Sequence, residues 1–169
     1  MIRALALLAV AVGLAGSSSE TRLAVPVIPQ ARERCGPAAL AMVLSFYGAD
    51  SAALRETDRA YDPVLRGALI TELAACARRL GYEARVAEPG PDSLRRLVAE
   101  GVPPILLVGS GQGPLVRGHY VVLTAWDIRA SRVTLLDGGP TPRSSSVASF
   151  LRAWRRQGGQ ALLVSVPRR

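Results

Sequence analysis

The stretch that decides the fold is QARERCGPAALAMVLSFYG, residues 30–48, which delivers Cys35 from a loop into the first turn of a helix. Pro37 lies just inside the predicted helix start, where its missing N–H costs nothing. Apolar residues follow at helical spacing, the alanines between them are strong helix formers, and Gly48 ends the pattern. The positive end of a helix dipole favours thiolate over thiol, which a cysteine nucleophile requires. Cys35 is therefore a candidate nucleophile; a small buried cysteine, or half of a disulfide, is the alternative.

Length and composition are those of one globular domain. The chain has 169 residues, enough for a sizeable core, and 49% of them are apolar, which excludes a disordered chain. The formal net charge is +8, and all 21 basic residues are arginine. A basic chain can indicate a nucleic-acid partner. Here the arginines are scattered and aromatic residues are few, so the sequence does not predict a basic groove lined by aromatic residues that stack on bases. We therefore expect no nucleic-acid partner.

The first residues have the pattern of a secretory signal. A positive start at residues 1–3 precedes an apolar run at residues 4–14 and small residues. The run is short for a bilayer span; an uncleaved anchor is the alternative. Ser17 stands where a bacterial lipoprotein signal has its lipidated cysteine, so no thioether lipid can form. We expect residues 1–22 to be a signal peptide and disordered start and residues 23–169 to be one domain. The protein is then periplasmic or secreted, without stable membrane insertion after cleavage.

Export raises the question of a disulfide, because the chain has two cysteines, Cys35 and Cys76. Cys76 lies in a predicted helix, residues 68–80, on a stripe of leucines, which favours a small core residue. A Cys35–Cys76 bond stays open as the alternative, and it would end the nucleophile hypothesis.

The hydrophobic period changes along the chain. The first half predicts helices at 35–47, 51–57, 68–80 and 93–100, the last capped by Asp92, with a short strand at 83–87. The second half predicts strands at 104–108, 119–126, 132–137 and 161–166, with one amphipathic helix at 146–157. Helices that precede strands indicate an α+β domain with an antiparallel sheet.

His119 is the only histidine in the sequence, so it is the one imidazole that a thiolate can use as a proton partner. It opens the strand at 119–126, after a glycine-rich run at 109–118 that we interpret as a rim or lid of the site. A phosphate-binding loop would need a helix after these glycines, and none is predicted. An ordinary surface or core histidine is the alternative.

Asp137 ends the next predicted strand and is the candidate that orients the imidazole. A hairpin centred at Ile128 would place His119 and Asp137 directly opposite each other, with Cβ atoms about 5 Å apart. Asp127 is the rival acceptor, at the other end of the hairpin. A role in starting the turn at 138–140 is the alternative for Asp137.

An acyl-transfer site also needs hydrogen-bond donors for the oxyanion. The backbone N–H of Cys35 is one candidate. The side-chain amide of Gln30, five residues upstream, is the second. A solvated loop residue is the alternative for Gln30.

These four residues, in this order, resemble a known family. The motifs QARERCGPAALAMVL, HYVVLTAWD and LLDGG are similar to those of the double-glycine, bacteriocin-processing cysteine peptidases of the papain-like superfamily. The resemblance runs from about residue 25 to the C-terminus. It implies a papain-like α+β fold, with N-terminal helices packed on an antiparallel sheet. It also implies Cys35 as nucleophile, His119 as base and acid, Asp137 as orienting residue and Gln30 as oxyanion donor.

The same resemblance implies cleavage of a leader peptide after a Gly-Gly pair. Transporter-linked members carry this domain in front of membrane spans and an ATPase, and an exported domain would be on the other side of the membrane from cytoplasmic leader processing. We predict an exported cysteine peptidase with a Cys-His-Asp triad and a peptide or protein substrate. A non-catalytic binding module of the same fold and a thiol acyltransferase are the alternatives. We expect no cofactor and no metal, and the oligomeric state stays open.

Overall fold

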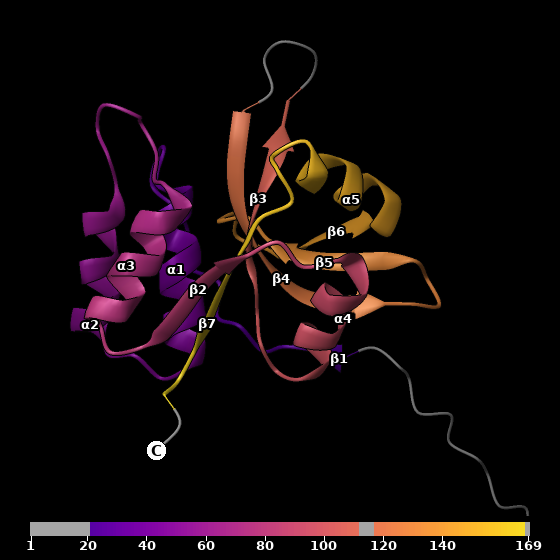
Figure 1. The fold of residues 1–169 in the computed structure, drawn as a ribbon, viewed down its shortest axis with the longest axis horizontal. Helices are drawn as coiled ribbons and strands as arrows, with labels where there is room; N and C mark the ends of the chain where they lie inside the picture. Colours follow the sequence, from indigo (N-terminus) through magenta and orange to yellow (C-terminus); the bar gives the residue numbers. More distant parts are fainter. Residues whose placement is uncertain (1–20, 112–116, 168–169) are drawn as a thin grey trace, which may run out of the picture.

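The structure, a computed structural model, describes residues 21–111 and 117–167. A group of helices lies beside an antiparallel sheet, and two further helices lie against the sheet (Figure 1). The α+β prediction is thus confirmed. The elements are β1 (Thr21–Arg22), α1 (Cys35–Phe46), α2 (Ser51–Glu56), η1 (Thr57–Ala60), α3 (Ile70–Arg79), β2 (Glu83–Ala87), α4 (Pro91–Ala99), β3 (Ile105–Ser110), β4 (Arg117–Asp127), β5 (Arg132–Leu136), β6 (Arg143–Ser146), α5 (Val147–Arg155) and β7 (Ala161–Ser165).

The sheet has the strand order β2-β7-β3-β4-β5-β6, and β1 pairs with β4. Its two faces are covered differently. Tyr120 and Val122 of β4 pack into a core with α1 and α3, whereas Val121 and Leu123 pack into a second core with α4 and α5. Alternate residues of one strand therefore serve opposite faces, as the pleat requires.

The predicted helices are present, with small shifts at their ends. α1 begins at Cys35, as its sequence predicts. α4 begins at Pro91, because a proline at the first helical position loses no hydrogen bond. Gly90 is the N-cap and Asp92 lies in the first turn, so the predicted Asp92 cap was wrong. α5 follows Ser146, whose hydroxyl accepts the Ser149 N–H at 3.2 Å.

The β4–β5 hairpin has a different register from the one predicted. Asp127 pairs with Arg132 at the loop, and a bulge shifts the pairing between Leu123 and Ala125. The hairpin is therefore not centred at Ile128, and the prediction that His119 and Asp137 lie directly opposite was wrong.

The two residues nevertheless stay on one side of the hairpin. Val122 pairs with Leu136. Extending that register places Val121 opposite Asp137 and leaves His119 as a diagonal neighbour on the same face. Near the site, the predicted pairing differs from the observed one by two residues. Because side chains alternate along a strand, a shift of two residues keeps each side chain on the same face of the sheet.

Four short strand segments were not predicted. β1 pairs with the far end of β4, although the segment around it was expected to be disordered. β6 pairs with β5. Both ends of the glycine-rich run at 109–118 are strand, with Gly109 opposite Gly118. The middle of that run, residues 112–116, and the predicted signal, residues 1–20, lie outside the described residues.

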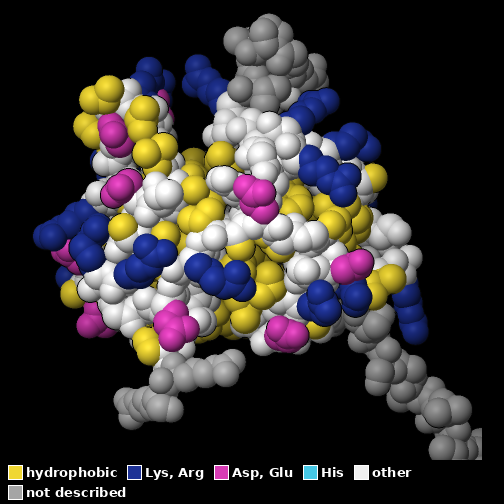
Figure 2. Space-filling view, viewed as in Figure 1, with side chains coloured by type: hydrophobic (Ala, Val, Ile, Leu, Met, Phe, Trp, Pro, Cys, Tyr) yellow, Lys and Arg dark blue, Asp and Glu magenta, His cyan; other side chains and the backbone are white. Residues whose placement is uncertain are grey.

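Within the described ranges, we find no helix with the length and apolar character needed to cross a membrane. On the face drawn in Figure 2, arginine side chains are spread among acidic ones rather than gathered into one patch.

Candidate active site

The sulfur of Cys35 lies at the start of α1, half-buried, where the helix offers unpaired N–H groups. The first turn carries no acidic residue, and Arg34 at the N-cap makes no side-chain capping bond. The backbone N–H groups of Gly36 and Tyr120 donate to the sulfur. This environment favours the thiolate.

His119 reaches the same sulfur from the beginning of β4. Its ring forms a hydrogen bond with Cys35. On the other side of the ring, Nε2 lies 3.0 Å from the main-chain oxygen of Asp137. A carbonyl oxygen can only accept, so Nε2 donates and Nδ1 is the ring nitrogen left for the sulfur.

The electrostatics of the pair favour an ion pair. Burial raises the pKa of the Cys35 thiol. The hydrogen bond and charge of His119, with the N–H groups of Tyr120 and Gly36, outweigh burial and bring the pKa below its ordinary value of 9.0. The hydrogen bond with Cys35 raises the pKa of His119 above 6.5 against the opposing effect of burial, and Asp137 adds to the rise. Both changes favour thiolate and imidazolium together.

Asp137 contacts the imidazole through its main chain rather than its carboxylate. One carboxylate oxygen, Oδ1, accepts the Gly139 N–H at 3.1 Å, and the other lies 3.5 Å from a guanidinium nitrogen of Arg143. Asp137 therefore both starts the turn and holds the ring of His119, which combines the two roles that the sequence left open. Asp127, the rival acceptor, lies at the far end of the hairpin, where its carboxylate accepts a hydrogen bond from the Ala130 N–H in the loop.

Gln30 lies against the turn that follows Asp137. Its backbone N–H donates to the Gly138 oxygen at 3.1 Å. Gly138 has φ +80°, and a Cβ there would lie 2.7–2.8 Å from Gln30 side-chain carbons. The buried Oε1 of Gln30 has no hydrogen-bond partner within the described part of the chain. The structure thus connects the four predicted residues. His119 contacts both Cys35 and Asp137, and Gln30 contacts Gly138, the residue after Asp137.

Sequence reasoning missed the packing that holds β4 against α1. A Cβ on Gly36 would lie 2.9 Å from Ala68 Cβ, 3.2 Å from the Tyr120 ring and 3.3 Å from Leu73 Cδ1. The Tyr120 hydroxyl donates to the Ala68 carbonyl at 3.0 Å. The close approach requires glycine beside the cysteine. The signal available in the sequence was strand alternation, which turns Tyr120 to the opposite face from His119.

Charged contacts fix the loop that leads into Cys35. The carboxylate of Glu33 binds the guanidinium of Arg66 and accepts the Tyr61 hydroxyl at 3.4 Å. Arg34 lies 4.0 Å from the centroid of the Tyr61 ring and pairs with Asp58 at 3.1 Å. These contacts connect the loop before Cys35 to η1 and to the segment that follows it.

Both cysteines are free, so the Cys35–Cys76 disulfide is not formed. Cys76 is buried in the core, with its sulfur 3.6 Å from the Glu56 carbonyl oxygen. Cys76 is therefore a small core residue, as its position among leucines on the helix predicted.

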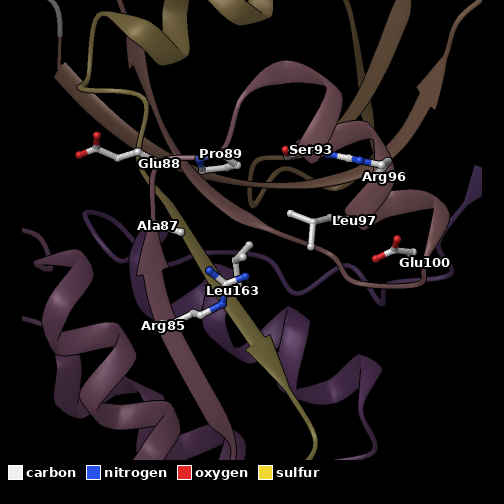
Figure 3. Close-up of a pocket in the computed structure, with 9 residues that line it drawn as sticks. All are labelled: Arg85, Ala87, Glu88, Pro89, Ser93, Arg96, Leu97, Glu100 and Leu163. Atoms are coloured by element: carbon white, nitrogen blue, oxygen red, sulfur yellow. Dashed lines mark hydrogen bonds between the residues drawn. The ribbon is translucent and has the colours of Figure 1, made fainter.

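Two cavities help to locate the chemistry. One of about 350 Å³ is lined by His119 and Asp137, between the sheet and α5. The other, of about 440 Å³, lies between β2, β7 and α4 (Figure 3). Its lining combines arginines, glutamates and leucines, namely Arg85, Ala87, Glu88, Pro89, Ser93, Arg96, Leu97, Glu100 and Leu163. His119, one member of the reactive pair, borders the first cavity, and we place the chemistry beside it.

Comparison with known families agrees with this geometry. Residues 24–167 match the model of the peptidase C39 family. The chain belongs to this family. It is therefore a cysteine peptidase of the papain-like superfamily, as the sequence motifs indicated. No curated protein matches the sequence of this C39 peptidase.

Solved structures share the fold. The peptidase domain of Streptococcus ComA, described as a bi-functional ABC transporter involved in a quorum sensing pathway, has 25% identity and a TM-score of 0.65, covering 85% of this chain and 99% of that one. A double glycine motif protease from an AMS/PCAT transporter, in complex with the leader peptide, has 23% identity and a TM-score of 0.67, covering 86% and 94%. A putative C39-like peptidase from Bacillus anthracis has 17% identity and a TM-score of 0.73, covering 89% and 99%.

Proposed function

We propose that this C39 peptidase hydrolyses peptide bonds through Cys35, His119 and Asp137. The observation that carries the proposal is the hydrogen bond between the Cys35 sulfur and the His119 ring, with both pKa values displaced toward the ion pair. A thiolate beside an imidazolium is the resting state that cysteine acyl transfer needs.

The first half of the reaction forms a thioester. The thiolate of Cys35 attacks the carbonyl carbon of the scissile bond, and a C–S bond forms. The N–H of Cys35 and the amide of Gln30 hold the oxyanion. His119 then gives its proton to the leaving nitrogen as the C–N bond breaks.

The second half regenerates the enzyme. Water attacks the thioester carbon and gives a proton to the neutral ring of His119. The C–S bond breaks, the acid product leaves, and Cys35 returns as the thiolate beside the imidazolium. Throughout, the main-chain oxygen of Asp137 keeps the ring in the tautomer that presents Nδ1 to the sulfur.

For the substrate, we propose a peptide cleaved after a Gly-Gly pair, outside the cytoplasm. The double glycine motif protease among the solved relatives was crystallised with the leader peptide. Export rests on the signal-like pattern of residues 1–22.

The test is a digestion of peptides by the purified full chain, with product sequencing. We expect wild-type protein to cleave and the Cys35→Ala and His119→Ala variants to lose at least about a hundredfold of the rate. Replacing Gly-Gly by Ala-Ala in the best peptide should reduce kcat/KM. Turnover that survives Cys35→Ala would remove this sulfur from the mechanism. Cell fractionation of the full chain, against a variant lacking residues 1–22, tests export.

A further inference from the structure

The cavity beside His119 has a lining suited to a side chain. It has a volume of about 350 Å³, and its lining comes from β3, β4, β5, β6 and α5. In Figure 1, α5 lies over this part of the sheet. Val121, Leu135 and Phe150 give it an apolar floor, and Ser145 and Ser149 add hydroxyl groups. The lining is thus part apolar and part polar, so it can both contact a side chain and orient it.

The mechanism decides which half of the substrate lies on this side. After attack, the acyl half stays attached to Cys35, while the leaving nitrogen must meet the proton on His119. His119 itself lines the cavity. The leaving half therefore departs toward the β4 side, where this cavity offers space for its first side chain.

The charges of the lining limit the ligand. Asp137 and Arg143 lie 3.5 Å apart and pair with each other. The imidazolium of His119, which also lines the cavity, is matched by the Cys35 thiolate. A charged substrate side chain would therefore lose its water shell without gaining an unmatched partner. An uncharged side chain loses little and gains contact with the apolar floor.

We propose that this cavity binds an uncharged side chain of the residue that directly follows the scissile bond. The proposal rests on the proposed peptidase function and adds a specificity pocket for the leaving half of the peptide. Ala153 lines the cavity from α5 without contributing to the reacting groups. It is thus a position at which the pocket can be filled.

The experiment compares two substrates that form the same thioester. One is a peptide with leucine directly after the scissile bond; the other is the methyl ester of the same acyl half. Ala153→Phe should lower kcat/KM for the peptide about tenfold or more. Hydrolysis of the ester should stay within about twofold of wild type, since methanol has no side chain to place. The matched control is Ala99→Phe, at an exposed position of α4.

A second arm needs no variant. In wild-type protein, peptides with leucine or glutamine after the scissile bond should be cleaved about tenfold faster than peptides with aspartate or lysine there. Ser149→Leu, which narrows the cavity one helical turn before Ala153 on α5, should weaken the preference if Ala153→Phe fails to fold as judged by thermal denaturation.

The inference is overturned if Ala153→Phe slows peptide and ester equally, if it slows neither, or if charged residues are accepted as well as leucine. Those results leave the peptidase function intact, because wild type still cleaves. If wild-type protein with an alkylatable Cys35 hydrolyses neither ester nor peptide, the proposed function fails and this inference fails with it.

Discussion

Replacing His119 with alanine should change the acid–base behaviour of Cys35 by a predictable amount. The substitution removes the hydrogen bond and the charge that lower the thiol pKa, while burial, which raises it, remains. A hydrogen bond to a charged group contributes about 1.5–3 kcal/mol. The sulfur is only half-buried, so the lower end of that range applies. That end corresponds to about a tenfold loss of thiolate at pH 7.

The assay is the rate of alkylation by iodoacetamide between pH 4 and 10, in a Cys76→Ala background. Only the thiolate reacts. The wild-type profile should rise at a pH below the ordinary thiol pKa of 9.0, because the folded state lowers the pKa of Cys35. The His119→Ala profile should rise at higher pH, with an alkylation rate at pH 7 about tenfold lower. A Cys35→Ala protein gives the background rate.

The outcome that would refute this reasoning is an unchanged profile. If wild type and His119→Ala react equally fast at pH 7, the imidazole does not stabilise the thiolate, and the ion pair is not the resting state. A wild-type inflection at or above pH 9.0 would have the same meaning.

Further predictions concern the packing and the turn around the pair. Gly36→Ala should lower the free energy of unfolding by about 1–3 kcal/mol, because the added methyl group overpacks against Ala68. Helix propensity offsets this by about 1 kcal/mol, and the Tm should fall. Asp137→Asn should reduce kcat/KM less than tenfold, because the main-chain oxygen that holds the ring is kept; a loss of a thousandfold would show that the carboxylate acts directly. Gly138→Ala should destabilise the chain by about 1–2 kcal/mol, because alanine is strained in the left-handed backbone conformation at this position; denaturant unfolding measures this loss. The added methyl group should also displace Gln30, and kcat measures that effect.

Local signals were enough for the elements that carry the reactive groups. The helix start at Cys35 follows from Pro37 and the apolar face, which are contained within one stretch of sequence. His119 was placed in a strand by its β-branched neighbours, and β4 confirms that placement. These signals act over a few residues and do not depend on the rest of the fold.

The parts that the sequence did not predict depend on distant contacts. The bulge between Leu123 and Ala125 adjusts β4 to a four-residue loop at one end and to the core at the other, and no local pattern marks it. β6 is polar and lacks an alternating pattern, and it exists through its pairing with β5. The orientation of the Asp137 carboxylate depends on Arg143, which arrives with β6.

Side chains alternate between the two faces along β4, and this links the distance between the His119 ring and the Cys35 sulfur to the stability of the core. His119 and Tyr120 are neighbours with side chains on opposite sides of the strand: one reaches the Cys35 sulfur, and the other packs against Gly36 and donates to Ala68. A change that moves Tyr120 therefore moves the imidazole with it. The Tyr120 N–H also donates to the sulfur, so the same two residues set the position, the hydrogen bonds and the charge environment of Cys35. Because these functions share one strand register, loss of packing at Gly36 and loss of thiolate reactivity should occur together.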